Sequence, residues 1–124
     1  MMQALAIAGG GAIGALMRFY ASTGIYAWLG RGFPYGTLFV NVTGSILMGF
    51  LYVWFLDRVQ VSPEMRAALL VGVLGAFTTF STFSIETLNL LENGEWMKAV
   101  TNIVLSVLLC IAGAWLGVIL GRQL

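Results

Sequence analysis

Residues 75–84 place hydroxyl groups and phenyl rings together in the middle of a long apolar stretch, in the order Gly-Ala-Phe-Thr-Thr-Phe-Ser-Thr-Phe-Ser. Lipid cannot hydrogen-bond a hydroxyl or a free peptide group, so such a cluster at bilayer depth must face protein, water or an ion. Five of the seven residues from 78 to 84 are serine or threonine, and Gly72 and Gly75 precede them. This density predicts a broken helix, whose freed backbone carbonyls can bind a cation such as sodium.

Two phenylalanines in this stretch, Phe80 and Phe83, are three residues apart and therefore share one helix face. A phenyl ring has a negative face and a positive edge, so two ring edges beside a donor could stabilise a small anion. Asn41 is a candidate for that donor, because its amide carries two N–H groups, and Thr37 lies one helical turn before it. The alternatives are ordinary core packing for the rings and an interhelical hydrogen bond for the amide.

Other polar residues in apolar stretches form a second group of candidates. Thr82 and Glu86 are four apart and line one track, and Glu86 is the only carboxyl well inside its stretch. Ser106 is a polar residue deep in the last stretch. Arg18 either extends toward the headgroups or attracts anions to the entrance of a pathway.

Composition places these residues in a membrane. The chain has 124 residues, of which 60% are hydrophobic and only 9% charged, and its net charge is +1. Soluble domains contain about 25% charged residues, so the main solvent is lipid, and no basic patch indicates nucleic acid. The chain has no histidine and a single cysteine, Cys110, which excludes histidine-dependent nucleophilic catalysis and argues against zinc, haem or iron–sulfur sites.

Four apolar stretches predict an all-α membrane protein with one four-span domain over residues 1–124. Each stretch can cross a hydrocarbon core about 30 Å thick; they run over residues 3–29, 35–56, 65–91 and 96–121. We expect the first to be a retained span and not a cleaved signal peptide, because no basic residue precedes it. Tyr26 is expected at a membrane interface, whereas Trp115 is expected to pack in the interior.

The charges do not set an orientation. Four spans put both termini on one side, where Arg58, Arg66 and Arg122 lie, and the opposite side has Arg31, Lys98 and, if it reaches that far, Arg18. Either the positive-inside rule does not apply here, or the chain inserts both ways and forms an antiparallel dimer. Glycines four residues apart predict close helix contacts, within one subunit or between subunits; they are Gly10 and Gly14, and Gly113, Gly117 and Gly121.

Three segments resemble the bacterial fluoride channels called Fluc or CrcB, and the resemblance covers the whole chain. The segments are residues 9–20 (GGGAIGALMRFY), 36–45 (GTLFVNVTGS) and 75–84 (GAFTTFSTFS). The last is a specific signature and not a generic hydrophobic pattern.

The resemblance implies an antiparallel homodimer in the cytoplasmic (inner) membrane of a bacterium, with two fluoride pores at its interface. Asn41, Phe80 and Phe83 would line the pore, and the backbone carbonyls of Gly75 and Thr78 would hold a structural, untransported Na⁺ on the dimer axis. Thr37, Thr82, Glu86 and Ser106 would form a secondary polar track, with Arg18 in the vestibule. The channel would export fluoride passively, without enzymatic activity.

Two other functions are compatible with four short spans. A small multidrug exporter requires a carboxylate, usually in the first span, but the only ionised residue of that span is Arg18. A non-conducting assembly subunit would require a partner chain and would pass no ions.

Overall fold

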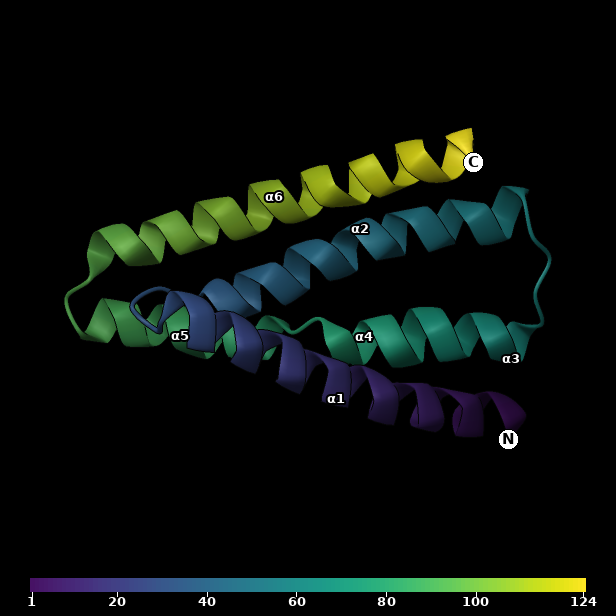
Figure 1. The fold of residues 1–124 in the computed structure, drawn as a ribbon, viewed down its shortest axis with the longest axis horizontal. Helices are drawn as coiled ribbons and strands as arrows, with labels where there is room; N and C mark the ends of the chain where they lie inside the picture. The colour runs from purple at the N-terminus through teal and green to yellow at the C-terminus, as the bar shows by residue number, and fades with distance from the viewer.

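The computed structural model describes all residues, 1–124, and consists of helices joined by short loops (Figure 1). The elements are α1 (Met2–Leu29), α2 (Tyr35–Asp57), α3 (Pro63–Arg66), the π-helix η1 (Ala67–Val73), α4 (Leu74–Phe77), α5 (Phe80–Glu92) and α6 (Trp96–Gln123). Because α3, η1, α4 and α5 together form one span, Pro63–Glu92, the structure has four helices long and apolar enough to cross a membrane. The four predicted spans are confirmed, including the break in the third.

Local sequence explains where these helices begin and end. Ser62 caps α3 by accepting a hydrogen bond from the Met65 N–H at 3.1 Å, with Pro63 at the first helical position. Gly30 and Gly94, with φ of +83° and +78°, follow α1 and α5 in the left-handed conformation that favours glycine. The resulting links are short, and both termini lie at one end of the bundle together with the α2–α3 link (Figure 1).

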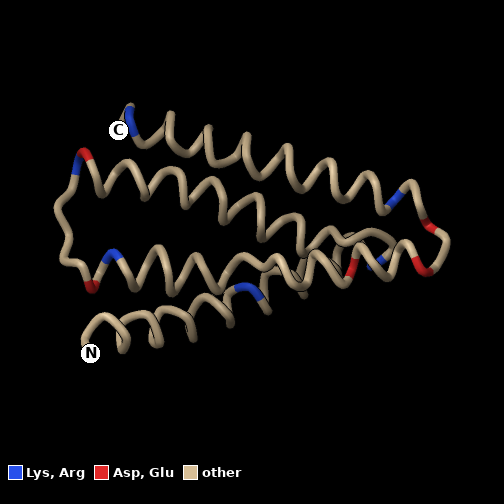
Figure 2. The backbone as a smooth tube through the Cα atoms, turned by 180° about the vertical axis from the view of Figure 1, so that it is seen from behind, with Lys and Arg blue, Asp and Glu red and all other residues tan.

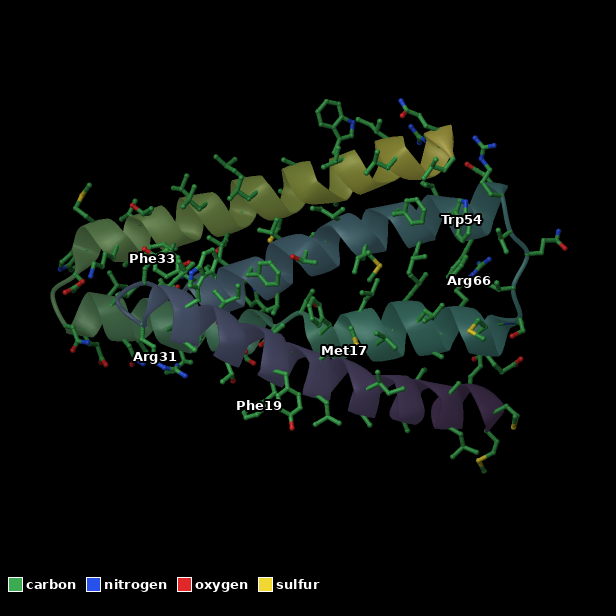
Figure 3. All side chains as sticks on the ribbon, in the orientation of Figure 1. Met17, Phe19, Arg31, Phe33, Trp54 and Arg66 are labelled. Atoms are coloured by element: carbon green, nitrogen blue, oxygen red, sulfur yellow. The ribbon has the colours of Figure 1, made fainter.

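Charged residues gather at the two ends of the bundle, with only a few along its length (Figure 2). Arg66 illustrates the end position: its guanidinium donates to the Phe55 carbonyl at 3.3 Å, near the membrane-end aromatic Trp54 (Figure 3). The two charged residues inside spans that need a separate account are Arg18 and Glu86.

The predicted glycine contacts lie within the chain. In α1, a Cβ atom at Gly10 or Gly14 would collide with backbone atoms of Ala68 or Val73 in η1. In α6, a Cβ at Gly117 would collide with the Ile46 carbonyl of α2. These glycines therefore pack α1 on the third span and α6 on α2, and the alternative of a glycine seam between subunits is not needed to explain them.

Two aromatic residues differ from the expectation. Tyr26 is buried, with 9% of its surface exposed, because its hydroxyl bonds to Thr37 and Glu86 inside the bundle. Trp115 is 69% exposed, so it does not pack in the interior of this chain.

The close contacts predict which glycines tolerate alanine. Gly14→Ala and Gly117→Ala should each lower the free energy of unfolding by about 1–3 kcal/mol, because backbone atoms must move apart. Thermal unfolding in detergent, followed by size-exclusion chromatography, measures the effect. Gly9→Ala and Gly11→Ala are the matched controls, since nothing lies within 4 Å of either added Cβ. Equal losses in both pairs would contradict the assigned contacts.

Candidate functional site

The third span is interrupted at Thr78 and Thr79, where the backbone becomes extended. Thr78 has φ −89° and ψ 160°, and Thr79 has φ −153° and ψ 121°. The Thr79 side chain then caps α5 by accepting a hydrogen bond from the Thr82 N–H at 3.2 Å. The threonine-rich sequence thus ends one helix and begins the next.

Asn41 of α2 replaces the backbone hydrogen bonds that Thr79 loses. Its Nδ2 donates to the Thr79 carbonyl at 2.9 Å, and its Oδ1 accepts from the Thr79 N–H at 2.7 Å. This two-point contact, the Asn41–Thr79 clamp, uses the acceptor and one of the two N–H donors of the amide. One N–H of a half-buried side chain remains for another acceptor.

The break also frees backbone carbonyls. The Thr79 N–H would reach Gly75 O in a continuous helix, and the Thr82 N–H would reach Thr78 O, but both donate elsewhere. The predicted cation-binding carbonyls of Gly75 and Thr78 are thus among those that lose their helical donors. The Ala76 carbonyl accepts a hydrogen bond from Arg18 Nε at 2.9 Å. Arg18 is therefore directed to the break and not to the headgroups.

A polar cavity of about 180 Å³ lies beside the break. It brings together Arg18, Thr37, Thr82 and Glu86 of the predicted residues; Ser22, Thr23, Tyr26, Arg31, Val40 and Thr79 also line it. An adjoining outer cavity of about 270 Å³ shares Tyr26, Arg31 and Glu86 with it. Two arginines and one glutamate line the polar cavity, so its walls carry a net positive charge that favours anions.

Tyr26 and Arg31 organise the wall that the two cavities share. The Tyr26 hydroxyl donates to Glu86 Oε2 at 2.8 Å, and the Arg31 guanidinium lies 4.5 Å from the Tyr26 ring centroid. Figure 3 shows Arg31 beside the ends of α1 and α5. The other carboxylate oxygen, Glu86 Oε1, is buried without a hydrogen-bond partner.

A third, more open pocket of about 270 Å³ is lined by Asn41, Gly44, Ser45, Met48, Thr78, Thr79, Phe80, Cys110 and Ala114. We call it the Phe80 pocket. The rings of Phe80 and Phe83 are 5.3 Å apart at an interplanar angle of 42°. Phe80 is 78% exposed whereas Phe83 is only 9% exposed. Thr79 lines both this pocket and the polar cavity.

The structure thus gathers most predicted residues around Thr79, with one exception and several additions. Ser106 lies away from the cavities and donates to Asn102 Oδ1 at 3.3 Å. The positions of Tyr26, Arg31 and Thr79 in the site were not predicted from the sequence. Thr79 could have been recognised as an N-cap, because its hydroxyl lies three residues before Thr82, whose N–H it accepts. The inward direction of the Tyr26 side chain has no local signal in the sequence.

The clamp predicts a different outcome for the same substitution at two asparagines. Asn41→Asp should lower the free energy of unfolding by about 1–3 kcal/mol or more, because a carboxylate oxygen would face the Thr79 carbonyl in place of a donor. Thermal unfolding in detergent measures this loss. Asn89→Asp is the control, since the Asn89 side chain is exposed and makes no hydrogen bond. Equal stability of the two variants would argue against the clamp.

Comparison with known proteins gives the family. Residues 5–118 match the family described as CrcB-like protein, Camphor Resistance (CrcB). A fluoride-specific ion channel FluC of Methylococcus capsulatus is 58% identical over 123 residues, which are 99% of this chain but only 54% of that relative. Proteins of the same name from Magnetococcus marinus and Coxiella burnetii are 54% and 51% identical over 98% and 99% of this chain, and over 98% and 100% of their own lengths.

These names describe ion channels and not enzymes, in agreement with the expectation from the sequence. The match covers the broken third span, the clamp and the polar cavity alike, and the four apolar helices make this a multi-pass membrane protein. The chain belongs to the CrcB-like protein family.

Proposed function

We propose that this chain forms a fluoride channel in the cytoplasmic (inner) membrane of a bacterium and lets fluoride leave the cytoplasm passively. The names of its relatives support this proposal. The observation that carries it is the arrangement around Thr79, where the positively charged polar cavity meets the Phe80 pocket, lined by the Asn41 amide and the Phe80 ring, at a helix break. The Phe83 ring lies 5.3 Å from the Phe80 ring.

The pathway begins in the polar cavity. Arg18 and Arg31 raise the local concentration of anions there, and the hydroxyls of Thr37 and Thr82 replace part of the water around the ion. Fluoride then passes Thr79 to the free N–H of Asn41 and the edges of Phe80 and Phe83. Removing an anion from water is costly unless other donors replace the water, and these groups supply the replacement.

The working unit is an antiparallel homodimer with two pores at its interface. Phe80 supports this assembly, because a ring that belongs to the pathway is 78% exposed in the single chain and needs a second surface to enclose it. The closely spaced glycines of α1 and α6 already pack within the chain, so the exposed Phe80 face is the surface offered to the partner. The nearly equal number of cations at the two ends permits insertion in both orientations.

A sodium ion fits the carbonyls that the break releases. Carbonyl oxygens suit this hard cation, and Gly75 O and Thr78 O have each lost their helical N–H donor. Two copies would supply two carbonyls each. The ion would hold the two breaks together and is not transported.

The membrane potential drives the export. Hydrogen fluoride, a weak acid, crosses membranes and dissociates in a near-neutral cytoplasm, so fluoride accumulates inside. A negative interior favours anion exit by about 2.3 kcal/mol per 100 mV. A passive pathway is therefore sufficient, without ATP or proton coupling.

The decisive experiment is ion efflux from liposomes that contain the purified protein. We expect rapid efflux of fluoride and little efflux of chloride, measured with ion-selective electrodes. Phe80→Ile should lower fluoride efflux by roughly tenfold, because the positive ring edge that faces the ion is lost and a loss of about 1.4 kcal/mol corresponds to tenfold in rate.

The matched control is Phe19→Ile, because Phe19 is also exposed (59%) but points away from the bundle (Figure 3). It should leave efflux unchanged. No efflux of fluoride from the unsubstituted protein would favour the non-conducting assembly subunit, and unchanged efflux in Phe80→Ile would remove the ring from the pathway.

Removal of sodium tests the proposed cation. Replacing Na⁺ by N-methylglucamine should lower the melting temperature of the dimer and the fluoride efflux together, because the carbonyls of Gly75 and Thr78 would face one another without a cation. Titrating Na⁺ back should restore both with one saturation curve. A melting temperature that does not depend on Na⁺ would contradict the site.

A further inference from the structure

α5 follows the break and is held in place by side chains from three other helices. Asn41 of α2 binds Thr79 at its start, and Tyr26 of α1 donates to Glu86 at 2.8 Å. The third contact comes from α6, where Asn102 Nδ2 donates to Thr87 Oγ1 at 2.9 Å. The first two belong to the site described above, but the third does not.

The α6 contact is part of a directional chain of hydrogen bonds. The Ser106 hydroxyl donates to Asn102 Oδ1 at 3.3 Å, and Asn102 donates to Thr87. The Thr87 hydroxyl in turn donates to the Phe83 carbonyl at 2.7 Å. This series of hydrogen bonds therefore ends on the backbone carbonyl of Phe83, whose ring belongs to the proposed pathway.

These side chains are buried and none lines a cavity. Asn102 is 1% exposed, Thr87 7% and Ser106 8%. Polar groups inside a membrane are costly unless bonded, and here Thr87 and Asn102 satisfy one another. An ion in the polar cavity or in the Phe80 pocket could not bind these side chains without breaking their hydrogen bonds to one another. The network therefore acts by holding α5 in position and not by contact with the ion.

We propose that Asn102 and Thr87 are positioning residues that fix the depth and orientation of the Phe83 ring. This inference rests on the role of Phe83 in the proposed function. A continuous helix would set the position of Phe83 through the helix before it, but the break at Thr78 and Thr79 removes that restraint. The Asn41 and Tyr26 contacts restrain the start and one face of α5, and the bond from Asn102 adds an anchor to α6 one turn after the ring.

The test compares substitutions that differ by one hydroxyl. Thr87→Val keeps the shape of the side chain but leaves the Asn102 amide without its acceptor and the Phe83 carbonyl without its extra donor. Thr87→Ser keeps the hydroxyl. Val53→Ala is the control for a loss of stability alone, because Val53 is 6% exposed and lies on α2 against Gly121, far from α5.

Two readouts separate position from stability. The first is fluoride efflux per folded protein, with the melting temperature of each variant. The second is the ¹⁹F resonance of 4-fluorophenylalanine incorporated at position 83, which reports the environment of the ring without any fluoride transport.

We expect Thr87→Val to lower fluoride efflux by roughly tenfold and to shift the ¹⁹F resonance. Thr87→Ser should keep efflux within about twofold of the parent protein and leave the ¹⁹F resonance close to the parent position. Val53→Ala should melt at a lower temperature yet keep efflux and resonance. If Thr87→Val does not fold, Asn102→Ser breaks the same bond and is measured in the same way.

An unmoved resonance in Thr87→Val would overturn the inference. So would unchanged efflux, or losses of efflux that follow the melting temperature equally in Thr87→Val and Val53→Ala. If the parent itself passes no fluoride, the proposed function fails, and the ¹⁹F resonance alone decides whether Thr87 positions the ring.

Discussion

A peptide group that leaves the helical pattern inside a bilayer has no water to bind, so the protein must replace its hydrogen bonds. The break at Thr78 and Thr79 meets this constraint with three side chains. Asn41 bonds both polar groups of Thr79, Arg18 takes the Ala76 carbonyl, and the Thr79 hydroxyl takes the Thr82 N–H. Because Asn41 and Arg18 come from two different helices, the broken span can exist only in the assembled bundle.

Glycine packing brings those side chains within reach. Arg18 lies one turn after Gly14, whose missing side chain lets α1 contact η1, so the arginine arrives beside Ala76. Asn41 depends in the same way on Gly44 of α2, whose missing side chain lets α2 contact Thr78 and Phe77 at the break. The glycine contacts and the polar contacts therefore depend on each other, because only closely packed helices let these side chains reach the backbone N–H and C=O groups freed at the break.

Sequence alone predicted features that have a local signal. Span length follows from apolar runs, and the break follows from the density of hydroxyls after Gly75. The π-helix over Ala67–Val73 has no such signal, because its residues are ordinary apolar ones; it packs closely on α1 at Gly72. The inward direction of Tyr26 likewise depends on Glu86, sixty residues away in the sequence. Tertiary contacts, which no local pattern records, decided both.

The distribution of restraints explains why the residues of the proposed pathway can lie on a half-helix. In an unbroken helix, the backbone would fix the carbonyls of Gly75 and Thr78 and the rings that follow them as one rigid unit. Those carbonyls would also accept hydrogen bonds within the helix and could not bind a cation. In the broken span, Gly75 lies just before the break and Thr78 lies in it, each with a released carbonyl, while Phe80 and Phe83 follow it on α5. Groups that suit a cation and groups that suit an anion are thereby separated along one span. Contacts from α1, α2 and α6 then restrain α5 independently of α4, so a halide-sized site can be built there without changing the carbonyl geometry.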